Sequence, residues 1–408
     1  NNPDGTKTIT YHAEDVHDFA WTADPNYRVI TDSWTGSAGT VQIRLLMQSG
    51  HLDQVPRYLN TLKGTLEYFD RWYGPYPYNR ITVVDPVHGA RAGGMEYPTF
   101  ITAGTTWWMP RGLLFPELVT EHEFGHNYWY GIVANNEFED AWLDEGINSY
   151  AEVKVMDALL GAERSTLNFW GLTANERGFQ RLSYRSYPDT DPLVRNSYEF
   201  ISGGAYGAVS YSKAACVLLT LEGLIGEETV RQALHTYFMR YRFTHPTEED
   251  FLRTVEEVAG QDLRWYFDQA VYGTQRFDYG IYSVRSDRLD WYQKERPPAK
   301  KGETTYRSVV IVQRKGDFVF PCELEIKFDT GEVVRERWDG RDRWVKFSYV
   351  KKAKVISAEI DPEHKVFLDV NLFNDSYTTE SQRGATRKLA TLWLFLTQFL
   401  AQLLAWLA

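Results

Sequence analysis

Two histidines and two glutamates are spaced as a shared metal ion and an activated water molecule would require. His122 and His126 stand four residues apart, so a helix would place both imidazoles on one face, close enough to share an ion. Glu123 projects to a neighbouring position, where it could hold a water molecule without binding the metal. Glu145 opens the next predicted helix and is the natural third ligand.

This set of ligands predicts zinc. Two imidazoles and one carboxylate leave the fourth position of a tetrahedral zinc ion open, and water in that position has a pKa of about 7. Magnesium and calcium prefer ligands that are all oxygen. The alternative is that His122 and His126 are ordinary core or surface residues, but the chain has only nine histidines and the full pattern rarely arises by chance.

Helices must position these residues, and the sequence predicts several of them. We expect helices over residues 113–133 and 141–160, which carry the histidine pair and the third ligand. An earlier helix begins after Pro56, where apolar residues recur at helical spacing, and it ends at Gly74 before a proline. Three later helices are expected near residues 211–225, 227–240 and 248–259.

Strands are predicted toward both ends of the chain. Residues 27–31 and 40–46 carry alternating or β-branched side chains between turn residues, and residues 81–84 form a short apolar strand. In the C-terminal part, Cys322–Phe328 alternates apolar with polar side chains, and short strands continue to about Val370. Regular strands with turns between them predict a small antiparallel sandwich.

Several segments together resemble a known peptidase family. The His-Glu-x-x-His pair, followed after eighteen residues by a glutamate, is the signature of the gluzincin peptidases, and Trp-Leu-Asp-Glu-Gly at 142–146 resembles the M1 aminopeptidases within that group. Gly-Gly-Met-Glu at 93–96 resembles the family's Gly-x-Met-Glu-Asn element, and residues 206–214 are similar to the segment with its catalytic tyrosine. Gly-Pro-Tyr-Pro at 74–77 and Phe-Asp-Tyr at 277–279 resemble further family landmarks, so the likeness covers most of the chain.

The resemblance implies an α+β multidomain protein. Its centre would be a thermolysin-like, mainly helical zinc peptidase domain at residues 51–278, preceded at 1–50 by the remnant of an N-terminal β domain. An antiparallel β-sandwich domain would follow at 279–375, then a linker at 376–388 and a C-terminal apolar helix at 389–408.

The resemblance also implies roles for residues outside the zinc motif. Glu96, together with Gly94 and Met95, would bind the free amino terminus of the substrate, since a carboxylate forms a strong charge-assisted hydrogen bond with an ammonium group. Tyr211 would donate a hydrogen bond to the oxyanion that develops on the scissile carbonyl, with Tyr206 as its rival for that role. Without such roles, Glu96 would be a solvated turn residue and Tyr211 a core tyrosine.

A further carboxylate lies where it could support the metal ligands. Glu152 stands two helical turns beyond Glu145, on roughly the same face. It could accept the free N–H of a ligand histidine, which would fix the orientation of the ring. A plain surface carboxylate is an equally good interpretation of this residue.

The chain also departs from the family pattern. Tyr97 stands where the family has an asparagine, which could change the depth or shape of the substrate cleft. The glycine that usually falls four residues after the second histidine falls five after it, at Gly131, so the end of the helix could differ. Most of the N-terminal β domain, which supplies a second amino-binding carboxylate in many relatives, is expected to be absent.

These observations predict a zinc-dependent metallopeptidase that acts on peptides, most specifically an aminopeptidase with Glu123 as general base. An endopeptidase or another hydrolase of the same zinc class is the alternative among enzymes. A zinc-bearing binding protein without turnover is the alternative from another class.

Composition limits the partners. The net charge of −11 disfavours nucleic acid, because phosphate binding needs a basic surface. Cys216 and Cys322 lie far apart in sequence and are expected to be buried free thiols.

The last segment, residues 389–408, carries no charged side chain. About twenty helical residues at about 1.5 Å each span the hydrocarbon core of a bilayer, so a transmembrane helix is expected, and Arg387 and Lys388 directly precede it. An amphipathic helix docked on a partner, or one helix of a larger multi-span membrane protein, are the alternatives. The predicted location is a membrane, of the bacterial envelope type rather than the free cytosol.

Overall fold

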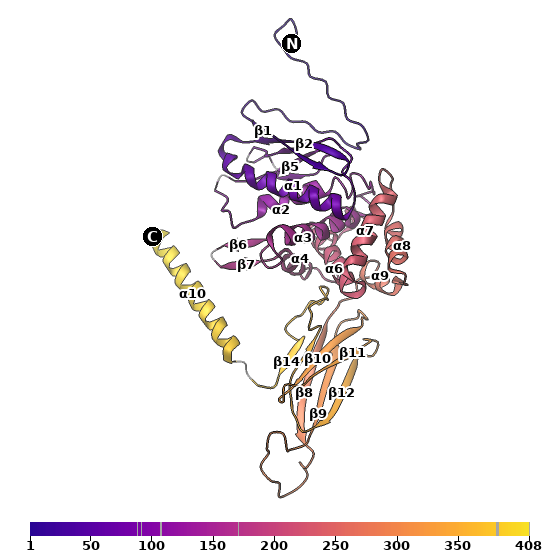
Figure 1. Ribbon diagram of the computed structural model, residues 1–408, viewed down its shortest axis with the longest axis vertical. Helices are drawn as coiled ribbons and strands as arrows, with labels where there is room; N and C mark the ends of the chain where they lie inside the picture. Colours follow the sequence, from indigo (N-terminus) through magenta and orange to yellow (C-terminus); the bar gives the residue numbers. More distant parts are fainter. Residues whose placement is uncertain (88, 91, 107, 170, 381–382, 408) are drawn as a thin grey trace. The chain divides into compact units, whose positions relative to one another are not determined.

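The computed structural model describes residues 1–87, 89–90, 92–106, 108–169, 171–380 and 383–407 (Figure 1). They form two compact units, one made of Asn1–Gln275 with Lys365–Leu368 and the other of Arg276–His364 with Asp369–Ala408. Both units contain helices and strands. The residues of the candidate site all lie in the first unit.

A five-stranded sheet forms one layer of the first unit, in the order β1-β2-β3-β5-β4. Its strands are β1 (Arg28–Gly36), β2 (Gly39–Met47), β3 (Arg80–Val84), β4 (Gly94–Met95) and β5 (Phe100–Ala103). The pairs β2–β3 and β3–β5 are parallel, whereas β1–β2 and β4–β5 are antiparallel. The strands within the segment 1–50 therefore pair into the same sheet as β3. The short strand β4 lies at an edge of this sheet.

Helix α1 (Val55–Trp72) packs against this sheet and against α2 (Phe115–Gly125) (Figure 1). Its buried face includes Tyr58, Leu62 and Phe69, whose spacing is that of an amphipathic helix. This confirms the predicted helix, and Gly74 (φ 145°) ends its final turn in a backbone conformation that suits glycine.

Helices and short turns make up the rest of the first unit. They are η1 (Ser49–Gln54), η2 (Trp142–Gly146), α3 (Ile147–Leu160), α4 (Glu176–Tyr184), η3 (Ser197–Glu199), α5 (Gly203–Tyr206), η4 (Gly207–Lys213), α6 (Ala214–Ile225), α7 (Glu227–Tyr241), α8 (Glu248–Ala259) and α9 (Arg264–Ala270), with the hairpin β6 (Leu167–Phe169) and β7 (Leu172–Ala174). The helices predicted near 227–240 and 248–259 are confirmed as α7 and α8.

The helix predicted over 113–133 is too long. Helix α2 ends at Gly125, and the chain then runs through tight turns in which Tyr130 has a positive φ of 89°. The N–H of Tyr130 donates to the carbonyl of Val133. A helix cannot continue through a residue with this backbone conformation, so apolar periodicity alone overestimated its length.

The second unit contains two antiparallel sheets. One has the order β12-β9-β8, with β8 (Tyr279–Arg288), β9 (Tyr306–Arg314) and β12 (Trp344–Lys351). The other has the order β11-β10-β13-β14, with β10 (Cys322–Phe328), β11 (Val333–Trp338), β13 (Val355–Ile360) and β14 (Ser376–Thr378). Alternate residues of β10 are buried, as the period of two predicted. Strand β14 lies in the stretch that the sequence predicts as a linker.

Helix α10 (Arg383–Leu407) carries the apolar C-terminal segment. Within it, Thr386–Ala405 is apolar and long enough to cross a membrane, and 0% of that window is buried. Gly203–Ile225 passes the same test of length and composition but is 72% buried, as a core helix is. Ser381, Gln382 and Ala408, which belong to the predicted linker and span, lie outside the described residues. Both cysteines are free and buried, as predicted.

Candidate metal centre

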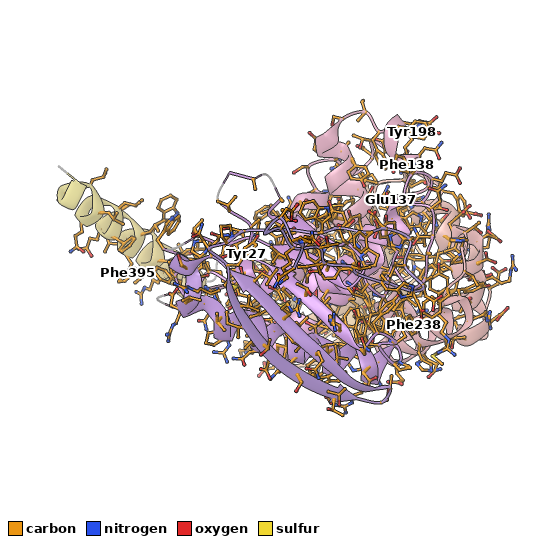
Figure 2. All side chains as sticks on the ribbon, turned by 90° about the horizontal axis from the view of Figure 1, so that it is seen from above. Tyr27, Glu137, Phe138, Tyr198, Phe238 and Phe395 are labelled. Atoms are coloured by element: carbon orange, nitrogen blue, oxygen red, sulfur yellow. The ribbon has the colours of Figure 1, made fainter. Side chains whose placement is uncertain are left out.

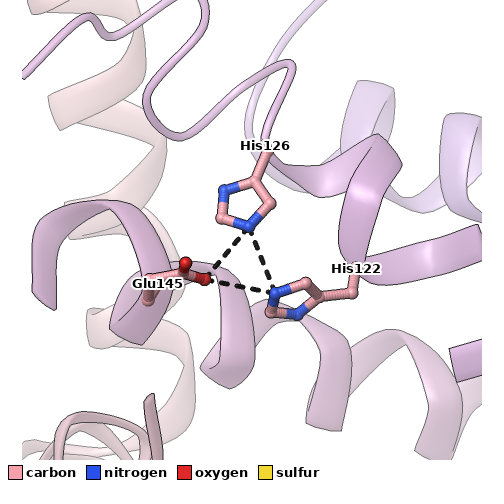
Figure 3. Close-up of side chains that lie close together, drawn as sticks. All are labelled: His122, His126 and Glu145. Atoms are coloured by element: carbon pink, nitrogen blue, oxygen red, sulfur yellow. Dashed lines mark hydrogen bonds and ion pairs between the residues drawn. The ribbon is translucent and has the colours of Figure 1, made fainter. Parts of the chain in front are cut away.

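Helix α2 places His122 and His126 side by side, because residues four apart lie on the same face of a helix. Their Nε2 atoms are 3.1 Å apart. Figure 3 shows both rings directed at the carboxylate of Glu145. Glu145 Oε2 lies 3.3 Å from His122 Nε2 and 3.1 Å from His126 Nε2.

These three distances fit one tetrahedral metal ion. Ligand atoms about 2.05 Å from a tetrahedral zinc lie roughly 3.3 Å from one another. The three atoms can therefore hold such an ion without rearrangement, and two neutral imidazoles with a carboxylate are a common zinc-binding donor set. Burial would raise the pKa of Glu145, but His126 and His122 lower it below its usual range, so this ligand is ionised.

The segment that carries Glu145 is a π-helical turn, η2, which opens directly into α3. Such turns have an extra residue, which changes the direction of the side chains, and they occur frequently at functional sites. The turn is entirely buried. It brings Glu145 to the histidines from a neighbouring element, and the sequence alone did not predict it.

Two further carboxylates contact the outer nitrogens of the histidines. Glu152 Oε2 lies 2.9 Å from His122 Nδ1, at the position that the sequence suggested for a supporting residue. Asp144 Oδ1 lies 2.6 Å from His126 Nδ1, which sequence reasoning missed although Asp144 directly precedes Glu145. Each carboxylate can fix one imidazole so that its Nε2 faces the centre.

The charge balance around the histidines favours a cation. Burial alone would lower the pKa of His122 and His126, but the surrounding carboxylates outweigh it and raise the pKa of both rings well above the usual range. A site that stabilises extra positive charge to this extent suits a bound metal ion.

Glu123 lies beside the three ligand atoms and is 8% exposed. Burial raises the pKa of its carboxyl group to about 7, an effect that the neighbouring histidines oppose. An oxygen of Glu123 lies within 4.8 Å of ligand-type atoms of both Glu96 and His126. Glu123 therefore lies close to the ligand atoms without being one of the three.

Glu96, Gly94 and Met95 lie on or next to the edge strand β4, which packs near α2. A Cβ atom on Gly94 would come within 2.4 Å of Oε1 of Glu123, so a larger residue here would make that carboxylate shift. Tyr97, which stands where the family has asparagine, accepts a hydrogen bond from the N–H of Phe100 through its carbonyl and closes the turn into β5.

Tyr211 lies on a second π-helical turn, η4, and its hydroxyl donates a hydrogen bond to Glu145 Oε1. Its ring lies 5.8 Å from the His122 ring in a stacked arrangement. The ring of the rival residue, Tyr206, contacts the ring of Tyr211, and their centroids are 6.2 Å apart. Burial and then Glu145 raise the pKa of Tyr211, so its hydroxyl keeps its proton and can act as a donor.

The shifted glycine has a structural explanation. Tyr130 stands four residues after His126, where the family usually has glycine, and it adopts the positive φ of 89° that glycine would adopt easily. Gly131 has no positive φ, but a Cβ there would come within 2.9 Å of the His126 carbonyl oxygen and 2.8 Å of that of Asn127. A bulky residue is thus held in an uncommon backbone conformation four residues after the second histidine.

The fold and this site define a protein of mixed helices and sheets with a candidate metal site of three ligands. The family described as the peptidase family M1 domain matches residues 57–269, which is more than half of the 408-residue chain. The chain therefore belongs to peptidase family M1.

Individual relatives are more distant. Aminopeptidase M1-B of Oryza sativa subsp. japonica is 22% identical over 267 residues, covering 62% of this chain and 29% of that protein. Aminopeptidase N of Escherichia coli K12 is 23% identical over 256 residues, covering 59% and 28%. Leukotriene A-4 hydrolase of Xenopus laevis is 29% identical over 194 residues, covering 46% and 30%. The chain thus spans less than a third of the length of each of these relatives.

A solved structure shares the fold. The structure of Legionella pneumophila aminopeptidase A in complex with aspartic acid aligns with a TM-score of 0.62 and 14% identity, over 84% of this chain and 38% of that chain. The mixed helix-and-sheet architecture with several antiparallel sheets is therefore an aminopeptidase-like fold.

Proposed function

We propose that this chain is a zinc-dependent metallopeptidase, and specifically an aminopeptidase that hydrolyses the first peptide bond of its substrates. The observation that carries the proposal is the convergence of His122 Nε2, His126 Nε2 and Glu145 Oε2 at 3.1–3.3 Å. These atoms would hold the zinc ion, which supplies a polarised substrate carbonyl and a water molecule of lowered pKa when it is bound.

The chain's own residues would carry the proton transfers. Glu123 accepts the proton of the attacking water and returns it to the leaving amine, a role for which its position beside the ligands suits it. Tyr211 donates its hydroxyl proton in a hydrogen bond to the oxyanion, and Glu152 keeps the His122 ring in place.

The edge strand β4 supports a specific path for the substrate. It pairs with β5 on one side and is last in the strand order, so an extended peptide can add to its other side. Glu96 follows this strand directly and is therefore placed to bind the amino terminus of a peptide that lies along it, which limits cleavage to the first bond.

The substitution Glu123→Gln tests the mechanism. It should keep zinc at one ion per chain, measured by mass spectrometry of the metal, and reduce kcat by about 10²–10⁴-fold, the usual contribution of a general base. Retained turnover in this variant would refute the role of Glu123.

The wild-type protein tests the specificity. An aminopeptidase hydrolyses an aminoacyl anilide with a free amine and leaves an internally quenched, N-blocked peptide intact. An endopeptidase does the reverse. If a zinc-loaded sample cleaves neither substrate, a zinc-bearing binding protein or a hydrolase that acts on another type of bond is favoured. The second of these is a specific candidate, because one relative is named leukotriene A-4 hydrolase.

We further infer the wider organisation of the protein. A boundary between a thermolysin-like catalytic domain at 51–278 and a sandwich domain at 279–375 receives support from the two compact units, whose first break falls after Gln275, whereas residues 1–50 belong to the same unit as the catalytic residues. Residues 389–407 would anchor the chain in a membrane, since the window Thr386–Ala405 is apolar and 0% of it is buried.

A further inference from the structure

Two glutamines stand one turn apart in the C-terminal helix α10. Gln398 and Gln402 both fall within Thr386–Ala405, the window that is long enough to cross a membrane. At about 1.5 Å per residue, Gln398 lies roughly 4 Å and Gln402 roughly 10 Å from the middle of this window along the helix axis. In a membrane whose hydrocarbon core is about 30 Å thick, both amides would therefore lie inside that core.

The two amides lack partners, whereas nearby hydroxyl groups have them. Thr391 Oγ1 and Thr397 Oγ1 donate hydrogen bonds of 2.9 Å to carbonyls of the preceding turn of the same helix. The side chains of Gln398 and Gln402 form no hydrogen bond with any described residue. A polar group without a hydrogen-bond partner is costly to place in hydrocarbon. These two side chains therefore require a partner that the described part of this chain does not supply.

The glutamines lie on one face of α10, which we call the glutamine face. It comprises Thr391, Gln398, Gln402 and Ala405, which fall within about 60° of one another around an axis with 3.6 residues per turn. Phe395 lies at the edge of this face (Figure 2 labels Phe395). The threonine and the alanine are small, and small residues let two helix backbones approach closely in a membrane.

The opposite face of α10 carries large apolar side chains. They are Leu389, Trp393, Leu396, Leu400 and Leu404, each between 40% and 67% exposed. Lipid tails are as apolar as leucine, so this face is satisfied by lipid and gains nothing from a hydrophobic partner. The contrast between the two faces indicates that the glutamine face is the one in contact with another helix.

A glutamine side chain is complementary to a second glutamine. Its amide nitrogen donates and its carbonyl oxygen accepts, so each residue can both donate to and accept from the same residue of a second copy across a twofold axis. The segment 389–407 contains no charged side chain, so it offers no reason for a partner of opposite charge. Arg387 and Lys388 precede the segment, at the depth of the head groups, where water and salt weaken their repulsion between copies.

We propose that α10 pairs with α10 of a second copy of this chain through the glutamine face, as parallel helices with twofold symmetry. Gln398 would then meet Gln398 of the second copy, and Gln402 would meet Gln402. This inference rests on the proposed membrane anchor and is independent of the peptidase activity.

Cysteine cross-linking shows which face is paired. The full chain is reconstituted in phosphatidylcholine vesicles with Thr391→Cys on the glutamine face, or with Leu389→Cys on the opposite face at nearly the same depth. The wild type is the background control, because Cys216 and Cys322 are both buried. On oxidation, Thr391→Cys should give a disulfide-linked dimer and Leu389→Cys about tenfold less of it, since a disulfide requires Cα atoms within about 7 Å of each other.

A second measurement shows whether the amides hold the pair together. Energy transfer between two populations of the full chain, labelled with different fluorophores at their amino termini, gives the dissociation constant in vesicles. Gln398→Leu combined with Gln402→Leu should weaken association about tenfold or more, since one hydrogen bond between membrane helices contributes roughly three- to thirtyfold. Leu396→Ala combined with Leu400→Ala, on the opposite face, is the matched control and should leave the dissociation constant unchanged.

Flotation of the vesicles separates the failures. If the wild type floats with the vesicles but the two cysteine variants cross-link equally, or neither does, this inference is overturned while the membrane anchor stands. Association of the double leucine variant as tight as that of the wild type would overturn it as well. A wild type that does not float removes the membrane anchor, and this inference with it. An equally strong dimer of a chain that ends before Arg383 would place the contact outside α10 and contradict the proposal.

Discussion

Replacing Glu152 should weaken zinc binding in two graded steps. Glu152 makes a single 2.9 Å contact with His122 Nδ1, and both side chains are largely buried. Glu152→Gln keeps an oxygen that can accept the N–H of His122 and loses only the charge. Glu152→Leu loses the hydrogen bond as well and leaves the N–H of a buried ligand without an acceptor.

The magnitudes follow from this difference. Loss of a group that supports a ligand histidine usually costs 10–100-fold in metal affinity. We expect about tenfold for the glutamine variant and about a hundredfold for the leucine variant, or about 1.4 and 2.7 kcal/mol of binding free energy. Competition with a chromophoric chelator measures both dissociation constants for zinc.

The metal-free protein should respond differently. Burial raises the pKa of Glu121 well above its usual range and that of Glu176 to about 8. After burial, the negative charge of Glu152 is the largest cause that raises the pKa of both residues. Neutralising Glu152 relieves this repulsion but also weakens its contact with His122, whose pKa it raises, so the two effects oppose each other and the melting temperature of metal-free Glu152→Gln should stay close to that of the wild type. Glu163→Gln, at an exposed position, is the control. A leucine variant that binds zinc within twofold of the wild type would refute the reasoning.

Three further predictions concern other parts of the chain. Tyr211→Phe should lower kcat about 10²–10³-fold, because it removes the hydrogen-bond donor to the oxyanion, whereas Tyr206→Phe should have a small effect; steady-state kinetics of both variants will show whether the roles are reversed. Burial lowers the pKa of Lys213 to about 8 in the folded protein, from 10.5 in the unfolded chain. Between these two pH values only the unfolded chain binds the proton, so stability should rise as the pH increases from 8 to 10.5, and the destabilisation is complete below pH 8. Relative to Lys213→Met, the unfolding free energy of the wild type should increase by about 3 kcal/mol across that window in denaturant titrations, and a constant difference would contradict the assignment. A chain that ends before Arg383 should move from the membrane to the soluble fraction on cell fractionation, and persistent membrane association would exclude α10 as the anchor.

Local patterns predicted the parts of the site that depend on local structure. The spacing of His122 and His126 determines that they share a helix face, and the alternation in Cys322–Phe328 determines which of its side chains are buried. Both follow from the period of one element, which the sequence contains directly.

Features that depend on several elements could not be predicted in this way. Helix α2 ends at Gly125 in a series of turns, and Tyr130, whose positive φ no propensity favours, prevents a helix from continuing to residue 133. The meeting of Glu96 with Glu137 requires β4 and a distant loop to be placed together by the fold. Short elements such as α4 were missed because few residues give little periodic signal.

The two π-helical turns explain how Glu145 and Tyr211, two residues with proposed roles in catalysis, come together. Gly146 ends η2, and a Cβ atom there would come within 2.8 Å of the Ser210 carbonyl oxygen in η4 and would collide with Ala214 at the start of α6. Only glycine allows this approach. Because Glu145 directly precedes Gly146 and Tyr211 directly follows Ser210, the same contact brings the third ligand and the proposed oxyanion donor within hydrogen-bonding distance. Backbone packing at Gly146 therefore allows these two residues to approach closely enough for the hydrogen bond between their side chains.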